Sequence, residues 1–337
     1  MQKAGENVKK IVDNINLHAY SSKLFRNYFD GKSFVVFDIE TTGLSPSKSK
    51  VVLTGLLTVQ ADGSAQVIQY FADQAEDEEA LIRATAAELE KADYIITYNG
   101  RHFDIPFMKT RAAIYDIDFP DLYNLDLYLL ISGFAPFKEA LPGLKQKNIE
   151  LYMGLSDGRE DLISGKESVD LYHRFMETRQ LELENKILLH NHDDIIQLYK
   201  ILPIIEKLDF HKALYKRGFL AGSYIIDQIT INGRVLSVKA KQYRNASDYI
   251  SFPTEEKPYS LMLNSASRDA ELSIPCECEA GAIYIDAQTI LGPALHHIEG
   301  FPAVTNGYLI LCQNNQVNEM EVNSFIKTFF QEECYAI

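Results

Sequence analysis

The sequence lacks any apolar run long enough to cross a membrane. A membrane helix needs roughly 18 or more consecutive apolar residues, and no stretch of the 337 residues approaches that length. The opening segment MQKAGENVKKIVDN carries lysines with no apolar core behind them, unlike a secretory signal. We therefore expect a cytoplasmic protein that makes no membrane contact.

Cysteine is also scarce. All four cysteines fall in the last quarter of the chain, and they are Cys276, Cys278, Cys312 and Cys334. Cys276-x-Cys278 could be half of a zinc site, but no second close cysteine pair and no nearby His-x-x-x-His accompanies it. We expect reduced thiols in place of a zinc site or a disulfide framework.

Positive charge is in deficit. The chain has 33 Lys and Arg against 47 Asp and Glu, which gives a net charge of −14. This balance argues against non-specific nucleic-acid binding, because such binding is driven by Lys and Arg that neutralise phosphates. Binding of nucleic acid through bound metal ions stays open, because divalent cations reverse the sign of the local electrostatic field.

The pattern of apolar and polar residues changes at two places along the chain. Residues 1–30 are predicted to form a helical lead-in, because apolar residues recur at spacings of three and four. Residues 31–205 combine three closely spaced strand patterns with a helix and a fourth strand, which predicts an α/β fold with an antiparallel meander, parallel strands and flanking helices. Residues 206–337 carry short strands and a hairpin signal at Asn232-Gly233, which predicts a smaller β-rich C-terminal domain.

Acidic side chains follow two of the predicted strands and begin a predicted helix. Asp38 and Glu40 lie two residues apart in FVVFDIETTG, so both project from one face of a strand. Asp104 follows the strand in YIITYNGRHFDIPF. In LLHNHDDIIQLYKIL, Asp194 opens an apolar-periodic helix, and His190 lies one turn earlier on the same face.

Carboxylates placed in this way suit a two-metal phosphodiester site. Mg²⁺ and Mn²⁺ prefer carboxylate oxygens, and two ions roughly 3.5–4 Å apart stabilise both the attacking and the leaving oxygen. A general base beside the attacking water completes such a site. DIETTG alone would be read as a helix cap or a solvated turn, but three motifs in order favour the metal site.

The motifs DIETTG, YNGRHFDIPF and HNHDD, in this order and at these separations, resemble the three exonuclease motifs of the DEDD superfamily of 3′-to-5′ exonucleases. Four further segments are similar to the small bacterial branch called YprB-like, namely QYFADQAEDEEALI, LYNLDLYLL, LPGLKQKNIE and REDLISG. The resemblance implies an RNase H-like fold for residues 31–205. It also implies a metal-dependent hydrolase that releases nucleoside 5′-monophosphates from a 3′ end.

The resemblance extends to individual residues. Asp38, Glu40, Asp104 and Asp194 match the family's ligands for two ions of Mg²⁺ or Mn²⁺. His190 falls where these enzymes place the Tyr or His that orients or deprotonates the water. The family spaces its residues as His-x-x-x-x-Asp or Tyr-x-x-x-Asp, whereas His190 and Asp194 combine the histidine with the tyrosine-type spacing.

Four residues near these motifs are candidates for substrate binding, and each has a plainer interpretation. Hydroxyl and N–H groups of Thr41 and Thr42 could meet a terminal nucleotide, or could simply form a β-turn. Asn99 could help to position the substrate or Asp104, or could only belong to a turn. Arg159 could contact a phosphate, or could pair locally with Asp161.

The expected partner is nucleic acid, as a single strand or a 3′ end. DNA and RNA are both open, because sugar discrimination depends on contacts to the 2′-OH that one sequence does not place. Lys145 and Lys147 could line the path of the nucleic acid or solvate a helix.

Two other functions stay open. An RNase H-like endonuclease would use similar acids on a related sheet. An inactive nuclease scaffold could bind nucleic acid or a partner, although the presence of all four acids argues against it. Residues 206–337 contain no chemical motif, so substrate delivery, homo-oligomer formation and binding of a protein partner are all open for this domain.

Overall fold

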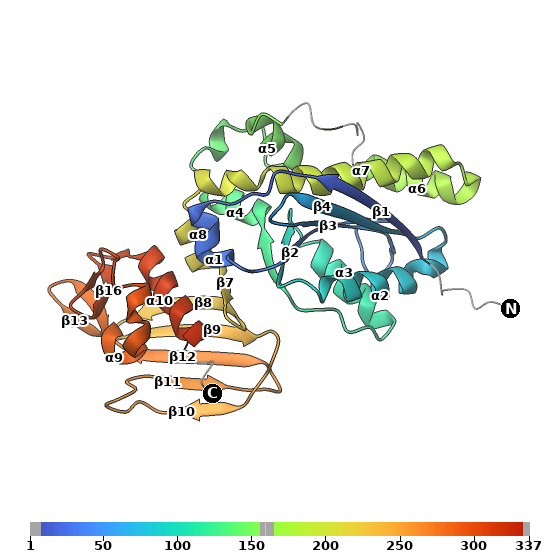
Figure 1. Cartoon of the computed structure of the whole chain (residues 1–337). Coiled ribbons are helices and arrows are strands. Elements are labelled where there is room, and N and C mark those ends of the chain that lie inside the picture. The colour runs from blue at the N-terminus through green and yellow to red at the C-terminus, as the bar shows by residue number, and fades with distance from the viewer. Residues whose placement is uncertain (1–7, 156–158, 160–164, 333–337) are drawn as a thin grey trace. The chain divides into compact units, whose positions relative to one another are not determined.

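The computed structural model describes residues 8–155, 159 and 165–332 (Figure 1). The chain divides into two compact units. The first consists of the residues up to Arg26 together with Asp30–Leu208. The second consists of Asn27–Phe29 together with the residues from Asp209 onward.

The first unit is built on a six-stranded mixed sheet with the strand order β1-β4-β3-β2-β5-β6. Its strands are β1 (Lys9–Asn16), β2 (Phe34–Thr41), β3 (Val51–Val59), β4 (Ser64–Phe71), β5 (Tyr94–Thr97) and β6 (Tyr123–Asp126). Strands β2, β3 and β4 form the predicted antiparallel meander, and β5 and β6 continue the sheet parallel to β2. The predicted α/β architecture is therefore confirmed.

The prediction of a helical lead-in over residues 1–30 is wrong for residues 9–16. These residues form β1, which pairs antiparallel with β4 from Lys9 opposite Phe71 to Asn16 opposite Ser64. The apolar spacing fits a helix locally, but the free edge of β4 offers backbone partners that a local pattern does not reveal. Within the described residues of this segment, helix is limited to α1 (Lys23–Phe29).

Helices cover both faces of this sheet (Figure 1). They are α2 (Glu78–Leu89), α3 (Asp104–Ile114), α4 (Leu127–Phe134), α5 (Gln146–Tyr152), α6 (Gly165–Thr178) and α7 (Leu181–Lys200), with 3-10 turns at Ala75–Asp77, Lys138–Ala140 and Leu202–Lys207. Because side chains alternate along a strand, Phe37 of β2 packs in a core with α2 and α3. Phe71 of β4 packs in a second core with α6 and α7 on the opposite face. None of the helices in the described ranges combines the length and apolarity needed to span a bilayer.

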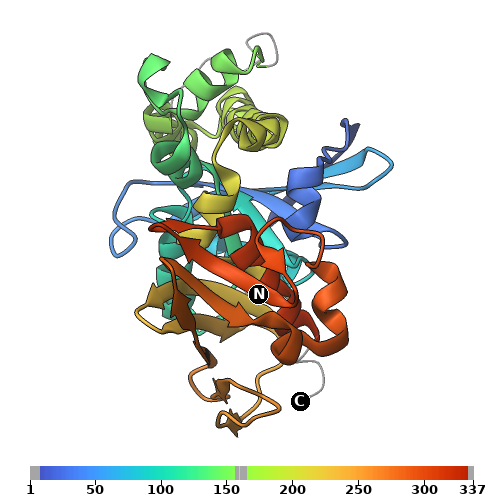
Figure 2. The same ribbon diagram turned by 90° about the vertical axis from the view of Figure 1, so that its left-hand side faces the viewer.

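The second unit contains two antiparallel sheets (Figure 2). The larger has the order β10-β11-β12-β9-β8-β7, and the smaller runs β13-β14-β16-β15 with β17 beside β16. The strands are β7 (Phe219–Ala221), β8 (Tyr224–Asn232), β9 (Val235–Gln242), β10 (Tyr249–Ser251), β11 (Ser260–Leu263), β12 (Asp269–Pro275), β13 (Glu277–Glu279), β14 (Ala282–Asp286), β15 (Val304–Thr305), β16 (Tyr308–Gln313) and β17 (Gln316–Val317). The helical segments are α8 (Phe210–Arg217), α9 (Ala287–Leu291), a 3-10 turn at Gly292–His297 and α10 (Glu319–Glu332).

Two sequence features of this second unit are explained by its structure. The predicted hairpin is confirmed, because β8 and β9 pair up to Asn232 opposite Val235, and Gly233 adopts φ +59° in the turn. Helix α10 contributes aromatic side chains to the core of the unit, where Phe329 packs edge-on against Tyr259 with ring centroids 4.9 Å apart. The unit is therefore β-rich with its own aromatic core.

A buried ion pair joins α2, α3 and β3 in the first unit. The Glu78 carboxylate is fully buried and accepts hydrogen bonds from Arg111 Nε at 2.8 Å and Nη2 at 2.6 Å. It also accepts from the Val51 N–H at 2.8 Å and the Tyr115 hydroxyl at 2.7 Å. Arg111 in turn donates to the Pro46 carbonyl in the β2–β3 loop. The desolvated charge of Glu78 is thus satisfied on all sides.

We predict that Arg111→Ala lowers the free energy of unfolding by about 3–5 kcal/mol, because it leaves the Glu78 charge buried without its partner. Chemical denaturation checks the value. Arg83→Ala is the matched control, since it removes an exposed ion pair on α2 and should cost less than about 0.5 kcal/mol. A loss below about 1 kcal/mol for Arg111→Ala would contradict the prediction.

Candidate active site

A cavity of about 660 Å³ opens where β2 ends. The strand β2, the loop after it and the segment between β5 and the start of α3 form one part of its wall. The start of α5, helix α7, Arg159 and one residue of α6 complete the wall. The polar and charged residues that line it are Asp38, Glu40, Thr41, Asn99, Asp104, Lys145, Gln146, Lys147, Asn148, Arg159, His190 and Asp194. All five predicted catalytic residues therefore lie around one cavity.

The acids reach the cavity from three elements. Asp38 and Glu40 project from β2, on the strand face opposite to Phe37. Asp104 is the first residue of α3, and its Oδ1 accepts a hydrogen bond from the Ile39 N–H at 3.2 Å. This bond fastens α3 to the strand that carries the other two acids.

The prediction that Asp194 opens a helix is wrong. Helix α7 begins at Leu181, and Asp194 lies in its C-terminal half. The apolar side chains Leu183 and Ile187 extend the buried face of the helix toward its N-terminus, where they join the core above Phe71. The carboxylate of Asp194 is consequently far from the positive end of the helix dipole, so a helix-start role does not explain it.

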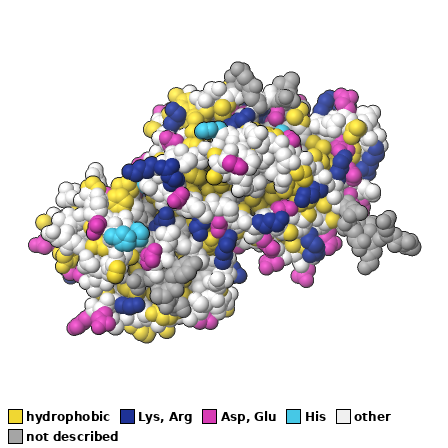
Figure 3. Space-filling model, in the orientation of Figure 1, with side chains coloured by type: hydrophobic (Ala, Val, Ile, Leu, Met, Phe, Trp, Pro, Cys, Tyr) yellow, Lys and Arg dark blue, Asp and Glu magenta, His cyan; other side chains and the backbone are white. Residues whose placement is uncertain are grey.

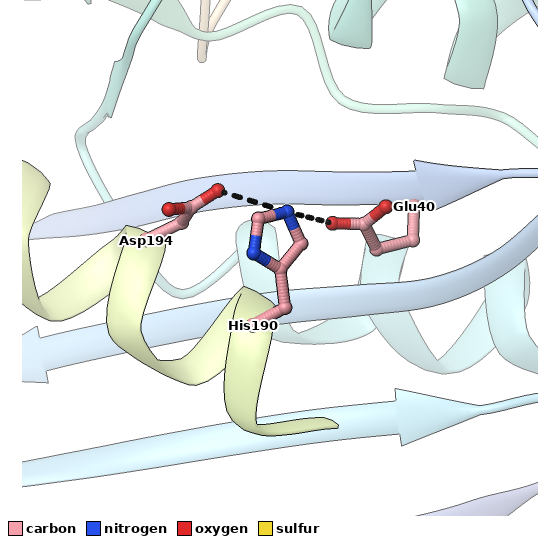
Figure 4. A group of neighbouring side chains, drawn as sticks. All are labelled: Glu40, His190 and Asp194. Atoms are coloured by element: carbon pink, nitrogen blue, oxygen red, sulfur yellow. Dashed lines mark ion pairs between the residues drawn. The ribbon is translucent and has the colours of Figure 1, made fainter. Parts of the chain in front are cut away.

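His190 lies between two of the acids (Figure 4). Its Nε2 is 3.6 Å from Glu40 Oε1 and 3.6 Å from Asp194 Oδ2. Glu40, His190 and Asp194 each offer one ligand atom, and these atoms lie within 4.8 Å of one another, which is close enough to hold a metal ion. The histidine predicted as a base therefore occupies a position from which it could also bind an ion.

Burial and repulsion between neighbouring charges raise the pKa of three acids of the cavity. Burial raises the pKa of Asp38 well above its ordinary value, and the charges of Asp104, Asp194 and Glu40 raise it further. Burial also raises the pKa of Glu40 to about 7, against the opposing effects of His190 and a hydrogen bond from Ser168. Burial raises the pKa of Asp104 to about 7. Without cations, the cavity therefore favours the protonated forms of Asp38, Glu40 and Asp104.

A strained loop forms the wall beside Asp104. Asn99 adopts φ +65°, a left-handed conformation that asparagine tolerates better than most residues. The carboxylate of Asp126 holds this loop by accepting from the Asn99 N–H at 2.9 Å and the Arg101 N–H at 3.0 Å. A Cβ on Gly100 would lie 2.5 Å from the Thr97 side chain, so the tight loop requires glycine there.

Of the four predicted substrate-binding residues, three line the cavity in the described part of the chain. Asn99 and Arg159 line the cavity, and so does Thr41, whose hydroxyl donates to the Gly43 carbonyl at 2.8 Å. The Thr42 hydroxyl instead accepts from the Lys50 N–H at 2.9 Å, and Thr42 is not among the described residues of the lining. Thr41 is the last residue of β2, and the Thr42 N–H donates to the Lys50 carbonyl at 2.9 Å, so these hydrogen bonds continue the pairing of β2 toward β3 and do not form the β-turn of the plainer interpretation.

Arg159 is held by two carboxylates. Its Nε and Nη2 each donate to the buried Glu150 carboxylate at 2.6 Å, and its Nη1 donates to Asp194. Asp161, the predicted local partner, lies outside the described residues. The two-pronged pairing with Glu150 fixes the guanidinium plane next to the cavity acids.

The structure adds a residue that sequence reasoning did not identify. Asn191 is fully buried, and its Nδ2 donates to Asp38 Oδ2 at 2.9 Å. The position of Asn191 beside His190 in HNHDD does not predict its contact with Asp38, because the two residues are far apart in the chain. The one available signal is Gly55 in the middle of the strand VVLTGLLTV, since an isolated glycine in a strand often marks a close approach.

Residues 35–205, more than half of the chain, match the RNase_H superfamily, and the chain belongs to this superfamily. Over 201 residues it is 25% identical to the Bacillus subtilis protein YprB, described as uncharacterized, with coverage of 58% of this chain and 47% of YprB. It is 34% identical over 76 residues to a DNA polymerase of Methanocaldococcus jannaschii, with coverage of 23% of this chain and 4% of the polymerase. The structure of a family B DNA polymerase from the hyperthermophilic archaeon Pyrobaculum calidifontis is similar, with a TM-score of 0.41 and 14% identity, over 90% of this chain and 47% of the polymerase. The chain thus spans about half or less of each of these proteins.

We predict that the metal-free protein becomes less stable as the pH rises from about 5 to about 8. Carboxyls with a raised folded-state pKa hold their protons more tightly in the folded protein than in the unfolded chain. Their contribution to stability is therefore complete below the unfolded-state pKa and is lost as the pH rises through the folded-state value, about 7 for Glu40 and Asp104. Chemical denaturation in EDTA at the two pH values measures the loss.

Asp38→Asn provides the comparison for this pH effect. It removes one buried acid and the repulsion that it exerts on Glu40, so the loss of stability with pH should be smaller than in the wild type. Equal pH dependence in the two proteins would show that the cavity acids do not cause it.

Proposed function

We propose that the protein is a metal-dependent 3′-to-5′ exonuclease of the DEDD type that hydrolyses phosphodiester bonds of DNA or RNA. The observation that carries the proposal is the convergence of Asp38, Glu40, Asp104, Asp194 and His190 around one cavity. Membership of the RNase_H superfamily supports the same conclusion.

The chemistry of the cavity fits divalent cations. Carboxylate oxygens are the ligands that Mg²⁺ and Mn²⁺ prefer, and the cavity gathers them in buried surroundings where the neighbouring acids raise the pKa of Asp38. A divalent ion would relieve this repulsion while leaving the acids ionised. We assign Asp38, Glu40, Asp104 and Asp194 as the residues that would hold two such ions. When bound, the ions would stabilise the attacking and leaving oxygens of the displacement.

The protein's own groups would handle the proton and the position of the strand. His190 Nε2 would accept the proton of the attacking water, and the carboxylates of Glu40 and Asp194, each 3.6 Å from that nitrogen, would stabilise the imidazolium that forms. The oxygen of that water would bond to the phosphorus while the bond between the phosphorus and the 3′ oxygen breaks. The 3′ oxygen would take up a proton from solvent as the nucleoside 5′-monophosphate leaves. A cavity of about 660 Å³ suits one terminal nucleotide better than a duplex.

The cavity walls suggest how a single strand would be held. We propose that Thr41, Thr42 and Asn99 approach the terminal nucleotide, with Thr42 contributing through its loop because its hydroxyl is already bonded to Lys50. We propose Arg159 and the cavity lysines as the groups that meet phosphates. Basic and acidic side chains are interspersed on the face seen in Figure 3, and the described residues form no broad basic surface there.

The direct test is degradation of 5′-end-labelled single-stranded DNA and RNA with Mg²⁺ or Mn²⁺. We expect products that shorten from the 3′ end, no reaction in EDTA, and a rate for Asp104→Ala lower by about 100-fold or more, because a ligand of the ions is lost. Asp121→Ala is the control, since Asp121 forms only an exposed pair with Lys109.

Two outcomes would contradict this proposal. Failure to cleave either nucleic acid with either ion would exclude a nuclease. Cleavage of a circular single strand as fast as a linear one would instead identify an endonuclease, because a circle offers no 3′ end.

His190 can be tested as a base separately from a role as a metal ligand. If it acts as the base, His190→Ala should lower kcat by about 100- to 10,000-fold. The Mn²⁺ concentration for half-maximal activity should then change by less than about threefold, because the four carboxylates still hold the ions. His192→Ala on the same helix is the control, since His192 pairs with Asp13 outside the cavity. A large rise in the Mn²⁺ requirement would instead make His190 a ligand.

A further inference from the structure

Asp38, Gly55 and Gln69 form one row across three neighbouring strands. Asp38 of β2 lies opposite Gly55 of β3, and Gly55 lies opposite Gln69 of β4. Helix α7 crosses this face of the sheet (Figure 1) and places Asn191 over the glycine. A Cβ on Gly55 would lie 2.1 Å from Asn191 Oδ1, so the row has space for Asn191 only because residue 55 has no side chain.

Asn191 bridges the two polar ends of this row. Its Nδ2 donates to Asp38 Oδ2 at 2.9 Å, and its Oδ1 accepts from Gln69 Nε2 at 2.9 Å. Gln69 Nε2 also donates to the Leu188 carbonyl of α7 at 2.9 Å. Asn191 is fully buried and Gln69 is 3% exposed, so water does not compete for these bonds.

The direction of the chain of hydrogen bonds follows from Gln69. Because its NH₂ group contacts both the Leu188 carbonyl and the Asn191 amide, the Asn191 oxygen must face Gln69 and its NH₂ must face Asp38. A neutral donor then orients the Asp38 carboxylate without cancelling its charge, unlike a lysine or an arginine at the same place. The bond occupies Oδ2 and leaves Oδ1 for an ion.

We propose that Asn191 and Gln69 are positioning residues that hold the Asp38 carboxylate in the orientation needed to bind a divalent cation, with Gly55 providing the space. This inference rests on the proposed function, because it takes Asp38 as a metal ligand. Groups that orient metal ligands through hydrogen bonds typically contribute about 10- to 100-fold to metal affinity.

Calorimetric titration of the purified full-length protein with Mn²⁺ alone tests the proposal without any nuclease assay. Asn191→Leu keeps a similar side-chain volume and removes the bond to Asp38, so we expect Mn²⁺ to bind about 10-fold or more weakly. Gln69→Glu replaces the donor by an acceptor and should turn the Asn191 oxygen toward Asp38, with a similar loss. Gln66→Leu is the matched control, since it removes an amide of the same strand that donates to Asn14 in an exposed hydrogen bond away from the cavity lining.

A double-mutant comparison separates positioning from a general loss of structure. In an Asp38→Asn background, Asn191→Leu should weaken Mn²⁺ binding by less than about twofold further, because the carboxylate that it orients is already gone. Thermal unfolding in EDTA shows whether each variant is folded. If Asn191→Leu does not fold, Gln69→Glu with the same comparison decides the question.

The outcomes distinguish this inference from the proposed function. If Asp38→Asn weakens Mn²⁺ binding while folded Asn191→Leu and Gln69→Glu bind within about threefold of the wild type, the inference is wrong and the proposed function stands. The inference would also be overturned if Asn191→Leu weakened Mn²⁺ binding equally in the wild type and in the Asp38→Asn background. If the wild type does not bind Mn²⁺, the proposed function fails and the inference fails with it.

Discussion

The close approach of α7 to the middle of the sheet is the constraint on which the site depends. Glu40 belongs to β2 and Asp194 to α7, and they meet only because the helix lies directly over β3. A side chain at Gly55 would push Asn191 away, since even a Cβ would be 2.1 Å from its amide oxygen. The missing side chain at Gly55 therefore sets the distance between the residues of the site on β2 and those on α7. Close packing keeps that distance nearly constant during small motions.

The cavity balances charge against burial. Within the described residues, Asn191 donates to Asp38, the Ile39 N–H donates to Asp104, Arg159 pairs with Asp194, and His190 and Ser168 lower the pKa of Glu40. Most of the remaining stabilisation must come from the apolar cores on the two faces of the sheet, because burial of apolar surface is the dominant favourable contribution to folding. Regions with such unfavourable electrostatics are typical of sites that bind or transform ligands.

The sequence was informative where structure is local. Alternation in FVVFDIETTG predicted both the central strand and the shared face of Asp38 and Glu40, because the two-residue period is a property of the strand itself. It was uninformative where structure depends on distant partners. Strand β1 exists because β4 has a free edge, and the start of α7 depends on a core that begins at Phe71. The pairing of Asn191 with Asp38 joins segments that only the folded topology brings together.

The double role of Asp126 has a consequence for local unfolding. The same carboxylate caps α4 by accepting from the Leu129 N–H at 3.3 Å and holds the left-handed loop at Asn99. Unfolding of the first turn of α4 would therefore also remove the acceptor that holds the cavity wall, so a short helix outside the cavity contributes to the shape of that wall.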